Sequence, residues 1–504
     1  MSRDNTCRTW GTVCSLPVQL HGESKQKTEN AESGEVIYMA LPKPVGKQLE
    51  VVCLAATGQY VVLGTAGSGK TTMAIARARY LANGLLPDAG RTLIVTYNRA
   101  LMNYINSFGD EIPEDVDVRN YHRFARGYLN SRGELPDGCI TSTGQREMLI
   151  EQAIEDVRQR HEDRAFFHRP LKFFLDEIQW LNGRNIESVD RYNDVTRTGR
   201  ASAQMNRVLR PIMWEILERY RQLKLQHGKL YDMDDIAAAV SASLDRDTRP
   251  RMYKHIIIDE GQDLSLEMIR SLTKAVPPDG SITFFGDVAQ RIYGHGRGMS
   301  WRDAGFQTRQ VWRFEQNYRN TRNIAKLAIA VSEMPYFSAG QDMIAPIVSA
   351  ADGPKPALVH FTDPEKEREL VRSVVGSRYR TQSVAVLLRT HEKIREIRPY
   401  LPADAVQLKE EAANWMANHG AYFGTYHSAK GLEFDLVILP FLSDAEIPNL
   451  DDAEADEVDE IFAEDGRLLY VGITRAKTSL VLTYTGGVTE LLPTDDALYS
   501  RSSR

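Results

Sequence analysis

The sequence predicts an α/β fold with two parallel sheets and a helical insertion in the first of them. Short apolar runs alternate with helical stretches along most of the chain, and these runs form two groups. A charged, aromatic-rich block with helical spacing, about residues 130–225, lies between strands of the first group. Continuous apolar strands separated by helices are typical of parallel sheets that are covered on both faces.

Apolar runs of strand length mark the two groups. The first group lies at residues 60–64, 91–97, 254–260 and 281–287, and the second at residues 357–361, 383–389, 435–440 and 479–484. A stretch with helical spacing follows the first run, as expected when parallel strands are joined by helices. Two such groups predict two α/β domains.

The expected domain boundaries follow from these runs and from changes in composition. Residues 1–38 are polar and show little periodicity, which favours a disordered extension. The first α/β domain is expected at residues 39–130 and 226–305, the helical subdomain at 131–225, the second α/β domain at 306–490 and a tail at 491–504.

The composition is that of a globular chain. Apolar residues make up 42% and charged residues 26% of the 504 residues, which excludes global disorder. No apolar run is long enough to span a membrane, and the first residues do not resemble a secretory signal. The four cysteines include no CxxC spacing, which argues against a disulfide framework and against zinc. We therefore expect a reducing, cytoplasmic compartment and no membrane partner.

The net charge of −6 does not exclude a nucleic-acid partner. Nine carboxylates and no basic residue lie at residues 451–465, and without them the charge changes from −6 to +3. A mildly basic body with one acidic segment can hold a basic channel. We expect the acidic segment to be an extended loop, because its charges repel one another.

A phosphate-binding loop is the clearest chemical signal. Residues 64–71 match G-x-x-x-x-G-K-[ST], and they follow a predicted strand and begin a predicted helix. Backbone N–H groups of such a loop point at phosphates, while Lys70 reaches the β and γ oxygens and the Thr71 hydroxyl ligates Mg²⁺. The expected cofactors are ATP and Mg²⁺. The expected nucleotide-binding residues of the loop are Gly64, Thr65, Ala66, Gly67, Ser68, Gly69, Lys70, Thr71 and Thr72.

An acid pair at the end of a buried strand narrows the class of NTPase. Asp259 and Glu260 follow the run His-Ile-Ile-Ile, at the edge where open α/β sheets bind ligands. Asp259 is the expected second magnesium residue, and Glu260 the residue that orients or deprotonates water. A small-molecule kinase would not need this adjacent base.

Residues 259–263 then resemble the DExQD box of UvrD/Rep/PcrA-type superfamily 1 helicases. Further motifs of that family follow the expected order, and the similarity covers about residues 46–485. The matching segments are Gln48 before the phosphate loop and residues 95–100, 120–124, 232–236, 286–293, 316–320, 425–434 and 469–476.

The resemblance implies two RecA-like P-loop domains, with the helical insertion as subdomain 1B, and it assigns roles to further residues. Gln48 reads the adenine edge and Tyr318 stacks on its face. Arg319 and Arg475 come from the second domain and neutralise the γ-phosphate. Gln290 senses the γ-phosphate, and Glu433 lies on the nucleotide side of the cleft.

The same resemblance implies a track for single-stranded DNA. Phosphate contacts position such a strand, and aromatic faces stack on its bases. The sequence departs from the family where stacking residues are expected, with Thr96 in place of Phe and His295 in place of Trp, so Tyr97 is either a stacking or a core residue. The implied DNA-binding residues are Tyr97, Asn98, Arg99, His122, Tyr293, Thr425, His427 and Lys430.

Full-length members of the family carry a large helical subdomain, 2B, where this chain has only 35 residues between Arg389 and Thr425. We expect a stub at about residues 390–424 in place of 2B. The leading hypothesis is an ATP-driven helicase or translocase, 3′→5′ by resemblance, acting on single-stranded or tailed duplex DNA. The alternative is a DNA-stimulated ATPase that regulates a nuclease-containing complex, such as an antiphage defence system. A plain kinase or GTPase has no use for the later motifs.

Overall fold

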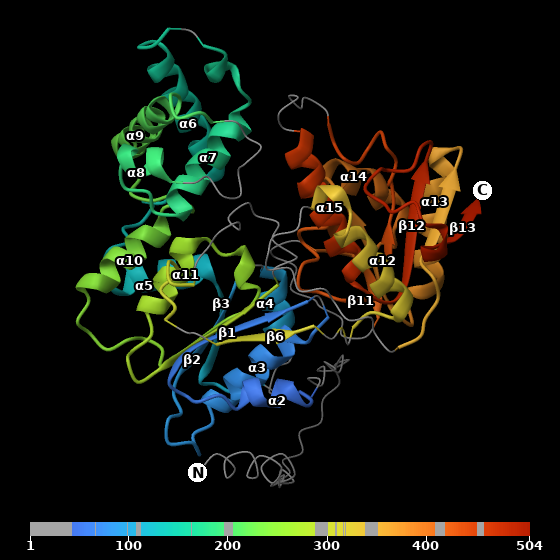
Figure 1. Cartoon of the computed structure of the whole chain (residues 1–504), viewed down its shortest axis with the longest axis horizontal. Coiled ribbons are helices and arrows are strands. Elements are labelled where there is room, and N and C mark those ends of the chain that lie inside the picture. The colour runs from blue at the N-terminus through green and yellow to red at the C-terminus, as the bar shows by residue number, and fades with distance from the viewer. Residues whose placement is uncertain are drawn as a thin grey trace, which may run out of the picture.

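The computed structural model describes residues 43–504 except 66, 98, 107–111, 163, 196–204, 288–300, 308–309, 316, 318, 338–350, 409–418 and 451–457. Two α/β domains lie side by side, and a helical body stands above the first of them (Figure 1). The expected disordered extension at residues 1–38 lies outside the described residues.

The first sheet is parallel, with the strand order β3-β2-β4-β5-β1-β6. It is buried on both faces, because neighbouring residues of one strand enter different cores: Ile257 enters one core, and Ile256 and Ile258 enter the other. The strands are β1 (Gly58–Gly64), β2 (Thr92–Thr96), β3 (Val116–Asn120), β4 (His255–Ile258), β5 (Ser281–Gly286) and β6 (Val311–Phe314).

Helices cover both faces of this sheet, as its apolar strands require. One face packs on α3 (Lys70–Leu81) and α4 (Arg99–Asn106), and α2 (Lys47–Val52) lies against α3. The other face packs on α5 (Tyr121–Ser131), α10 (Ile236–Arg246) and α11 (Leu266–Lys274). The predicted two-sided α/β architecture is therefore confirmed for this domain.

The second sheet is also parallel and has the order β13-β7-β12-β11-β8-β10-β9. Its strands are β7 (Ala357–Phe361), β8 (Ser383–Leu388), β9 (Val406–Gln407), β10 (Gly420–Thr425), β11 (Phe434–Leu439), β12 (Ala476–Thr485) and β13 (Ser500–Ser503). Its helices are α12 (Arg322–Ser332), α13 (Pro364–Arg378), α14 (His391–Ile397) and α15 (Val458–Thr474). Residues of α13 and α14 share one core and residues of α12 and α15 share the other, so this sheet is also covered on both faces.

The helical body has a core of its own, made of residues between 149 and 223. Its helices are α6 (Thr143–Arg158), α7 (Leu171–Gly183), α8 (Val189–Asp194) and α9 (Arg210–Gln226). Ser142 and Gln145 form a capping box that begins α6, and a proline lies in the first turn of α9. Short 3₁₀ turns lie at Ala165–His168, Gly261–Asp263, Pro335–Phe337, Arg398–Tyr400 and Asp496–Leu498.

Three segments differ from the expected organisation. Strand β6 pairs with β1 in the first sheet, beyond the expected boundary at residue 305. Strand β13, in the expected tail, pairs with β7. The expected stub at residues 390–424 contains α14, β9 and most of β10, which are parts of the second domain. Strand β10 contains glycines and β13 is polar, so neither forms the kind of continuous apolar run that predicted strands elsewhere in the chain.

The acidic segment also differs from the extended loop that was expected. Helix α15 begins at Val458, inside the segment, and Asp465 is fully buried. Its carboxylate pairs with Arg389, so one of the nine acids has a structural partner. Residues 451–457 lie outside the described residues. Of the described helices, none is long and apolar enough to cross a membrane.

We predict that the helical body can be destabilised separately from the sheets. Phe174 is fully buried, and its ring lies 5.3 Å from the rings of both Phe166 and Phe173. The substitution Phe174→Ala should destabilise this body by about 3–5 kcal/mol, because it leaves a cavity in a core that the sheets do not share. Hydrogen exchange should show lost protection in α6, α7 and α9 and retained protection in β1, β2 and β4.

The matched control is Leu225→Ala on α9, whose side chain is 59% exposed. It should change the free energy of unfolding by less than about 0.5 kcal/mol. Equal loss of protection in the body and in the first sheet after Phe174→Ala would contradict a separate core.

Candidate functional site

The candidate site lies at the carboxyl edge of the first sheet. Strand β1 leads into the phosphate loop, β4 into Asp259 and Glu260, and β5 into Asp287. Because all strands of the sheet are parallel, the segments that follow these three strands meet at one edge of the sheet. The second domain faces the same edge with Arg319, Lys430 and Arg475.

The phosphate loop is held in a conformation suited to an anion. Gly67 and Gly69 have φ angles of 77° and 84°, which favour glycine. The Lys70 ammonium donates hydrogen bonds to the carbonyl oxygens of Gly64 at 3.0 Å and Thr65 at 2.9 Å. Within the described part of the chain, the buried Ser68 hydroxyl has no hydrogen-bond partner. A buried donor without a partner is what a phosphate oxygen would satisfy.

Asp259 is placed to bind a cation. It is fully buried, one carboxylate oxygen accepts from the Glu260 N–H at 3.0 Å, and the other has no partner among the described residues. Burial, and then the charge of Glu260, raises the pKa of Asp259 to about 7. The Thr71 hydroxyl beside it favours the ionised form. A hard divalent cation prefers such oxygen ligands, so the residues present fit Mg²⁺.

Glu260 lies in a different electrostatic environment. Burial opposes its ionisation, but the cations Lys70, Lys430 and Arg475 outweigh burial and lower the pKa of Glu260. Its φ angle of 51° is uncommon for a residue other than glycine and often marks a functional turn. The pKa of Asp259 is therefore raised while that of the adjacent Glu260 is lowered. Pairs of carboxylates with such opposite shifts are typical of catalytic sites.

Gln262 connects this acid to the next strand. Its side-chain N–H donates to the Glu260 carboxylate, and its carbonyl oxygen accepts from the Asp287 N–H at 2.8 Å. Asp287 lies 3.6 Å from the Lys70 ammonium. Neither Gln262 nor Asp287 was among the predicted site residues. The signals that could have identified them are the fourth position of the DExQD box and the carboxyl end of the strand SITFFG.

The second domain brings two arginines to the site. Arg319 donates to the Glu433 carboxylate at 2.8 Å. A side chain on Gly67 would collide with Asn317 and with Cβ of Arg319, so this segment lies directly against the phosphate loop. Arg475 is buried, and burial, followed by the nearby Arg319, lowers its pKa to about 10, which leaves it charged at neutral pH.

Arg475 is held by its own domain. It donates to the carbonyl oxygens of Val471 at 3.0 Å and Leu432 at 3.2 Å, and to the Thr474 hydroxyl at 3.1 Å. Its charge still lowers the pKa of Glu260 in the first domain. Burial opposes ionisation of Glu433, but the nearby cations, chiefly Arg319, outweigh burial and lower the pKa of Glu433.

A buried ion pair joins the two domains. The Lys430 ammonium contacts the Asp263 carboxylate, and both side chains are less than 4% exposed. Burial raises the pKa of Asp263 to about 6, although Lys430 opposes the shift. Lys430 was predicted to contact DNA; in this structure it binds Asp263, and a DNA contact stays a prediction.

Other predicted DNA-binding residues gather at the carboxyl ends of the strands. The rings of Tyr97 and His122, which follow β2 and β3, lie 6.1 Å apart and edge to face. Thr425 ends β10, and His427 follows it. Burial lowers the pKa of His427 to about 4, so its ring is neutral at pH 7. Tyr97 also packs against the core of the first domain, which leaves both of its interpretations open.

Several predicted site residues cannot be placed. Ala66, Asn98, Gln290, Tyr293 and Tyr318 lie outside the described residues, as does the side chain of Arg99. Their proposed roles stay predictions.

Gln48 does not point its amide into open space. Its side-chain N–H donates to the Ser68 carbonyl at 2.9 Å, and its carbonyl oxygen accepts from the Val45 N–H at 3.0 Å. The helix α2 that carries Gln48 is thereby attached to the phosphate loop. The predicted contact with adenine stays a prediction.

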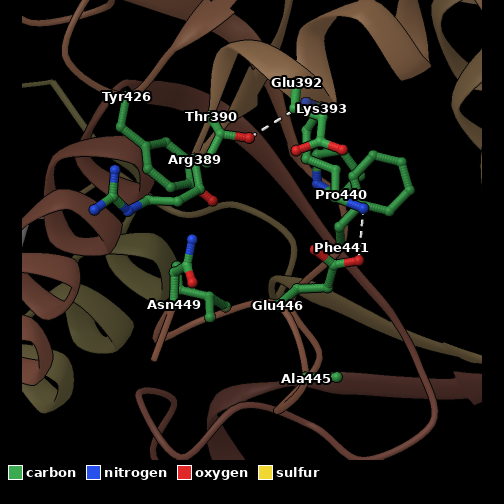
Figure 2. A pocket seen from close by; sticks show the side chains of 11 residues that line it. Arg389, Thr390, Glu392, Lys393, Tyr426, Pro440, Phe441, Ala445, Glu446 and Asn449 are labelled. Atoms are coloured by element: carbon green, nitrogen blue, oxygen red, sulfur yellow. Dashed lines mark hydrogen bonds and ion pairs between the residues drawn. The ribbon is translucent and has the colours of Figure 1, made fainter. Parts of the chain in front are cut away.

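A cavity of about 290 Å³, which was not predicted from the sequence, lies at the carboxyl ends of β8, β10 and β11. Figure 2 shows Arg389 and Asn449 on one side of it and Lys393 and Glu446 on the other. Arg389 pairs with Asp465, whose second oxygen accepts from the Asn449 N–H at 3.1 Å. The signal in the sequence that could have indicated this cavity is Arg389, the arginine that ends the apolar run SVAVLLR.

Comparison with known proteins agrees with this geometry. Residues 45–311 match the family model described as UvrD/REP helicase N-terminal domain, and residues 409–487 match UvrD-like helicase C-terminal domain. The chain is similar to a probable DNA helicase of Mycoplasma pneumoniae, 23% identical over 84% of this chain and 80% of the relative. It is also similar to DNA helicase IV of Escherichia coli, 24% identical over 94% of this chain and 72% of the relative.

More distant similarity extends to the ATP-dependent DNA helicase srs2 of Schizosaccharomyces pombe, 24% identical over 54% of this chain and 32% of that protein. The N-terminal family model alone spans more than half of the chain. The protein therefore belongs to the UvrD/REP-like helicases and is an ATP-dependent enzyme of that family.

Proposed function

We propose that this protein hydrolyses ATP to move along single-stranded DNA in the 3′→5′ direction and to separate tailed duplexes. The observation that carries the proposal is the meeting of the phosphate loop and acid pair of one sheet with Arg319 and Arg475 of the other domain. A site divided between two domains converts binding and hydrolysis of one nucleotide into relative domain motion.

In the proposed reaction, Lys70 exchanges its two carbonyl partners for the β and γ phosphate oxygens of ATP. Thr71 and Asp259 would hold Mg²⁺, which when bound supplies positive charge to the β and γ oxygens. Glu260, ionised through its neighbouring cations, orients the attacking water and accepts its proton. Arg319 and Arg475 neutralise the charge that develops on the transferred group.

DNA would lie across the carboxyl ends of both sheets. Tyr97, His122, Thr425 and His427 lie there, and Tyr293 is expected to join them. Lys430 and Asp263 connect this surface to the acid pair, since Asp263 belongs to the same turn as Glu260. The adenine would be read by Gln48 and Tyr318, and Gln290 would report the γ-phosphate.

A second candidate function is a DNA-stimulated ATPase that regulates a nuclease partner and unwinds little by itself. It is favoured by the segment between Arg389 and Thr425, whose described residues are used to build the second domain. Strand displacement of a 3′-tailed duplex by the isolated chain separates the two candidates. Unwinding that appears only when a nuclease partner is added would support the second.

The substitution Lys70→Ala should abolish ATP hydrolysis while the chain still folds. The rate should fall by about 100-fold or more, because a preorganised charge at the transition state is removed. Steady-state hydrolysis with saturating DNA measures it, and thermal melting checks the fold. The control is Lys274→Ala on α11, a partly exposed lysine that pairs with Asp245. Turnover of the Lys70 variant near that of the control would contradict the phosphate-site assignment.

The substitution Glu260→Gln should keep ATP binding and lower the hydrolysis rate by about 10²–10⁴-fold, because only activation of water is lost. The amide keeps the shape of the side chain and its contact with Gln262. Binding of a fluorescent ATP analogue and single-turnover hydrolysis measure the two effects separately. If nucleotide affinity falls instead, Glu260 is structural.

Single-stranded DNA should stimulate the ATPase and bind with a marked salt dependence. Each phosphate contact should add about −0.7 to the slope of log K against log salt concentration, despite the acidic pI of about 6.1. Equal ATPase rates with and without DNA at low salt would count against a translocase. A flat salt dependence would show that no basic track exists.

A further inference from the structure

Arg77 is a fully buried cation that no described role in catalysis requires. It lies in α3, the helix that begins with Lys70, and none of its side chain is exposed. Its Nε donates to the Thr283 hydroxyl of β5 at 2.8 Å. The other guanidinium nitrogens donate to backbone carbonyl oxygens, at 3.2 Å to Val52, 2.9 Å to Leu54 and 3.0 Å to Ala55.

These acceptors lie at one end of a single short helix. Helix α2 ends at Val52, and Leu54 and Ala55 follow in the turn that leads to β1. No carboxylate forms an ion pair with Arg77 among the described residues. Carbonyl oxygens at the end of a helix carry partial negative charge, and five fixed N–H donors match several of them at once. Arg77 therefore fixes the carboxyl end of α2 against α3 and β5.

The other end of α2 lies on the phosphate loop. Gln48, in its first turn, donates to the Ser68 carbonyl, and a side chain on Gly69 would lie 2.7 Å from the Gln48 amide nitrogen. Helix α2 lies against α3 (Figure 1). Lys70 and Arg77 thus belong to one rigid helix, which holds the phosphate loop at its start and the end of α2 seven residues later.

We propose that Arg77 is a positioning residue for adenine recognition: it sets the place of α2, and so of Gln48, relative to the phosphate loop. This inference rests on the proposed contact between Gln48 and adenine. It predicts that Arg77 affects the choice of base, whereas a residue that only stabilises the domain would affect all nucleotides equally.

The test compares ATP with GTP in the full-length chain at saturating single-stranded DNA. Arg77→Lys and Arg77→Gln each keep donors but cannot reach every acceptor. Each should raise KM for ATP about tenfold, the factor expected when one hydrogen-bonded contact is misplaced. We expect kcat to stay within about twofold and KM for GTP to change little, because Gln48 does not match guanine. Gln48→Ala should have the same signature, and Arg77→Lys should add little to it.

Arg210→Lys is the matched control. Arg210 is also buried and donates to carbonyl oxygens at the end of a six-residue helix, at 2.6 Å to Tyr192, 2.8 Å to Asn193 and 3.0 Å to Val195. It lies in the helical body, so its substitution should leave the ATP-to-GTP preference unchanged.

The outcomes separate the inference from the proposed function. Unchanged preference in Gln48→Ala would reject the adenine contact itself. Altered preference in Gln48→Ala, with unchanged preference in both Arg77 variants, would reject only the role of Arg77. An equal rise of KM for ATP and GTP, or failure of both Arg77 variants to fold at 20 °C, would also reject it, because Arg77 would then support the loop or the whole domain.

Discussion

Buried charge at the meeting of the two domains is the constraint on which the rest of the structure depends. Several ionised groups cannot be removed from water unless they compensate one another at close range. The buried cations are Lys70, Lys430 and Arg475, and the buried acids are Asp259, Glu260, Asp263 and Asp287. Among these described residues acids exceed cations by one. Burial, and then the charge of the neighbouring Glu260, raises the pKa of Asp259. An excess of acid beside a phosphate loop is the condition that a divalent cation corrects.

Because these buried charges come from both domains, we expect the relative position of the domains to depend on what occupies the site. Lys70 is satisfied by two carbonyl oxygens and lies near Asp287, so a triphosphate that takes Lys70 alters the field at Glu260. Glu260 is also influenced by Lys430 and Arg475, both from the second domain. Neutral hydrogen bonds alone would transmit such a change weakly, whereas buried charges interact strongly because little solvent screens them. We therefore expect domain position and nucleotide state to be coupled through the same set of groups.

How far the sequence could predict this arrangement depended on the range of each interaction. The phosphate loop and the acid pair were predicted because their chemistry is contained in short, contiguous segments next to apolar strands. Pairs such as Lys430 with Asp263, or Gln262 with the Asp287 N–H, join distant segments, and only the sheet order brings them together. The same limit applies to strands: β4 is a continuous apolar run, whereas β13 is four exposed polar residues whose strand conformation comes from pairing with β7.

The covalent chain offers a direct route from the nucleotide to the surface proposed for DNA. Thr425 ends β10, His427 lies two residues later, and Lys430 follows within the same turn. The Thr425 hydroxyl accepts a hydrogen bond from the Ser428 N–H at 3.2 Å, and the Lys430 N–H donates to the His427 carbonyl at 3.2 Å. Two hydrogen bonds within the turn therefore hold its residues together. Because these hydrogen bonds connect the residues of the turn, we expect a displacement of the Lys430 backbone to move His427 and Thr425 with it. No long pathway is required, because Lys430, which contacts Asp263, and the residues proposed to hold DNA belong to one turn.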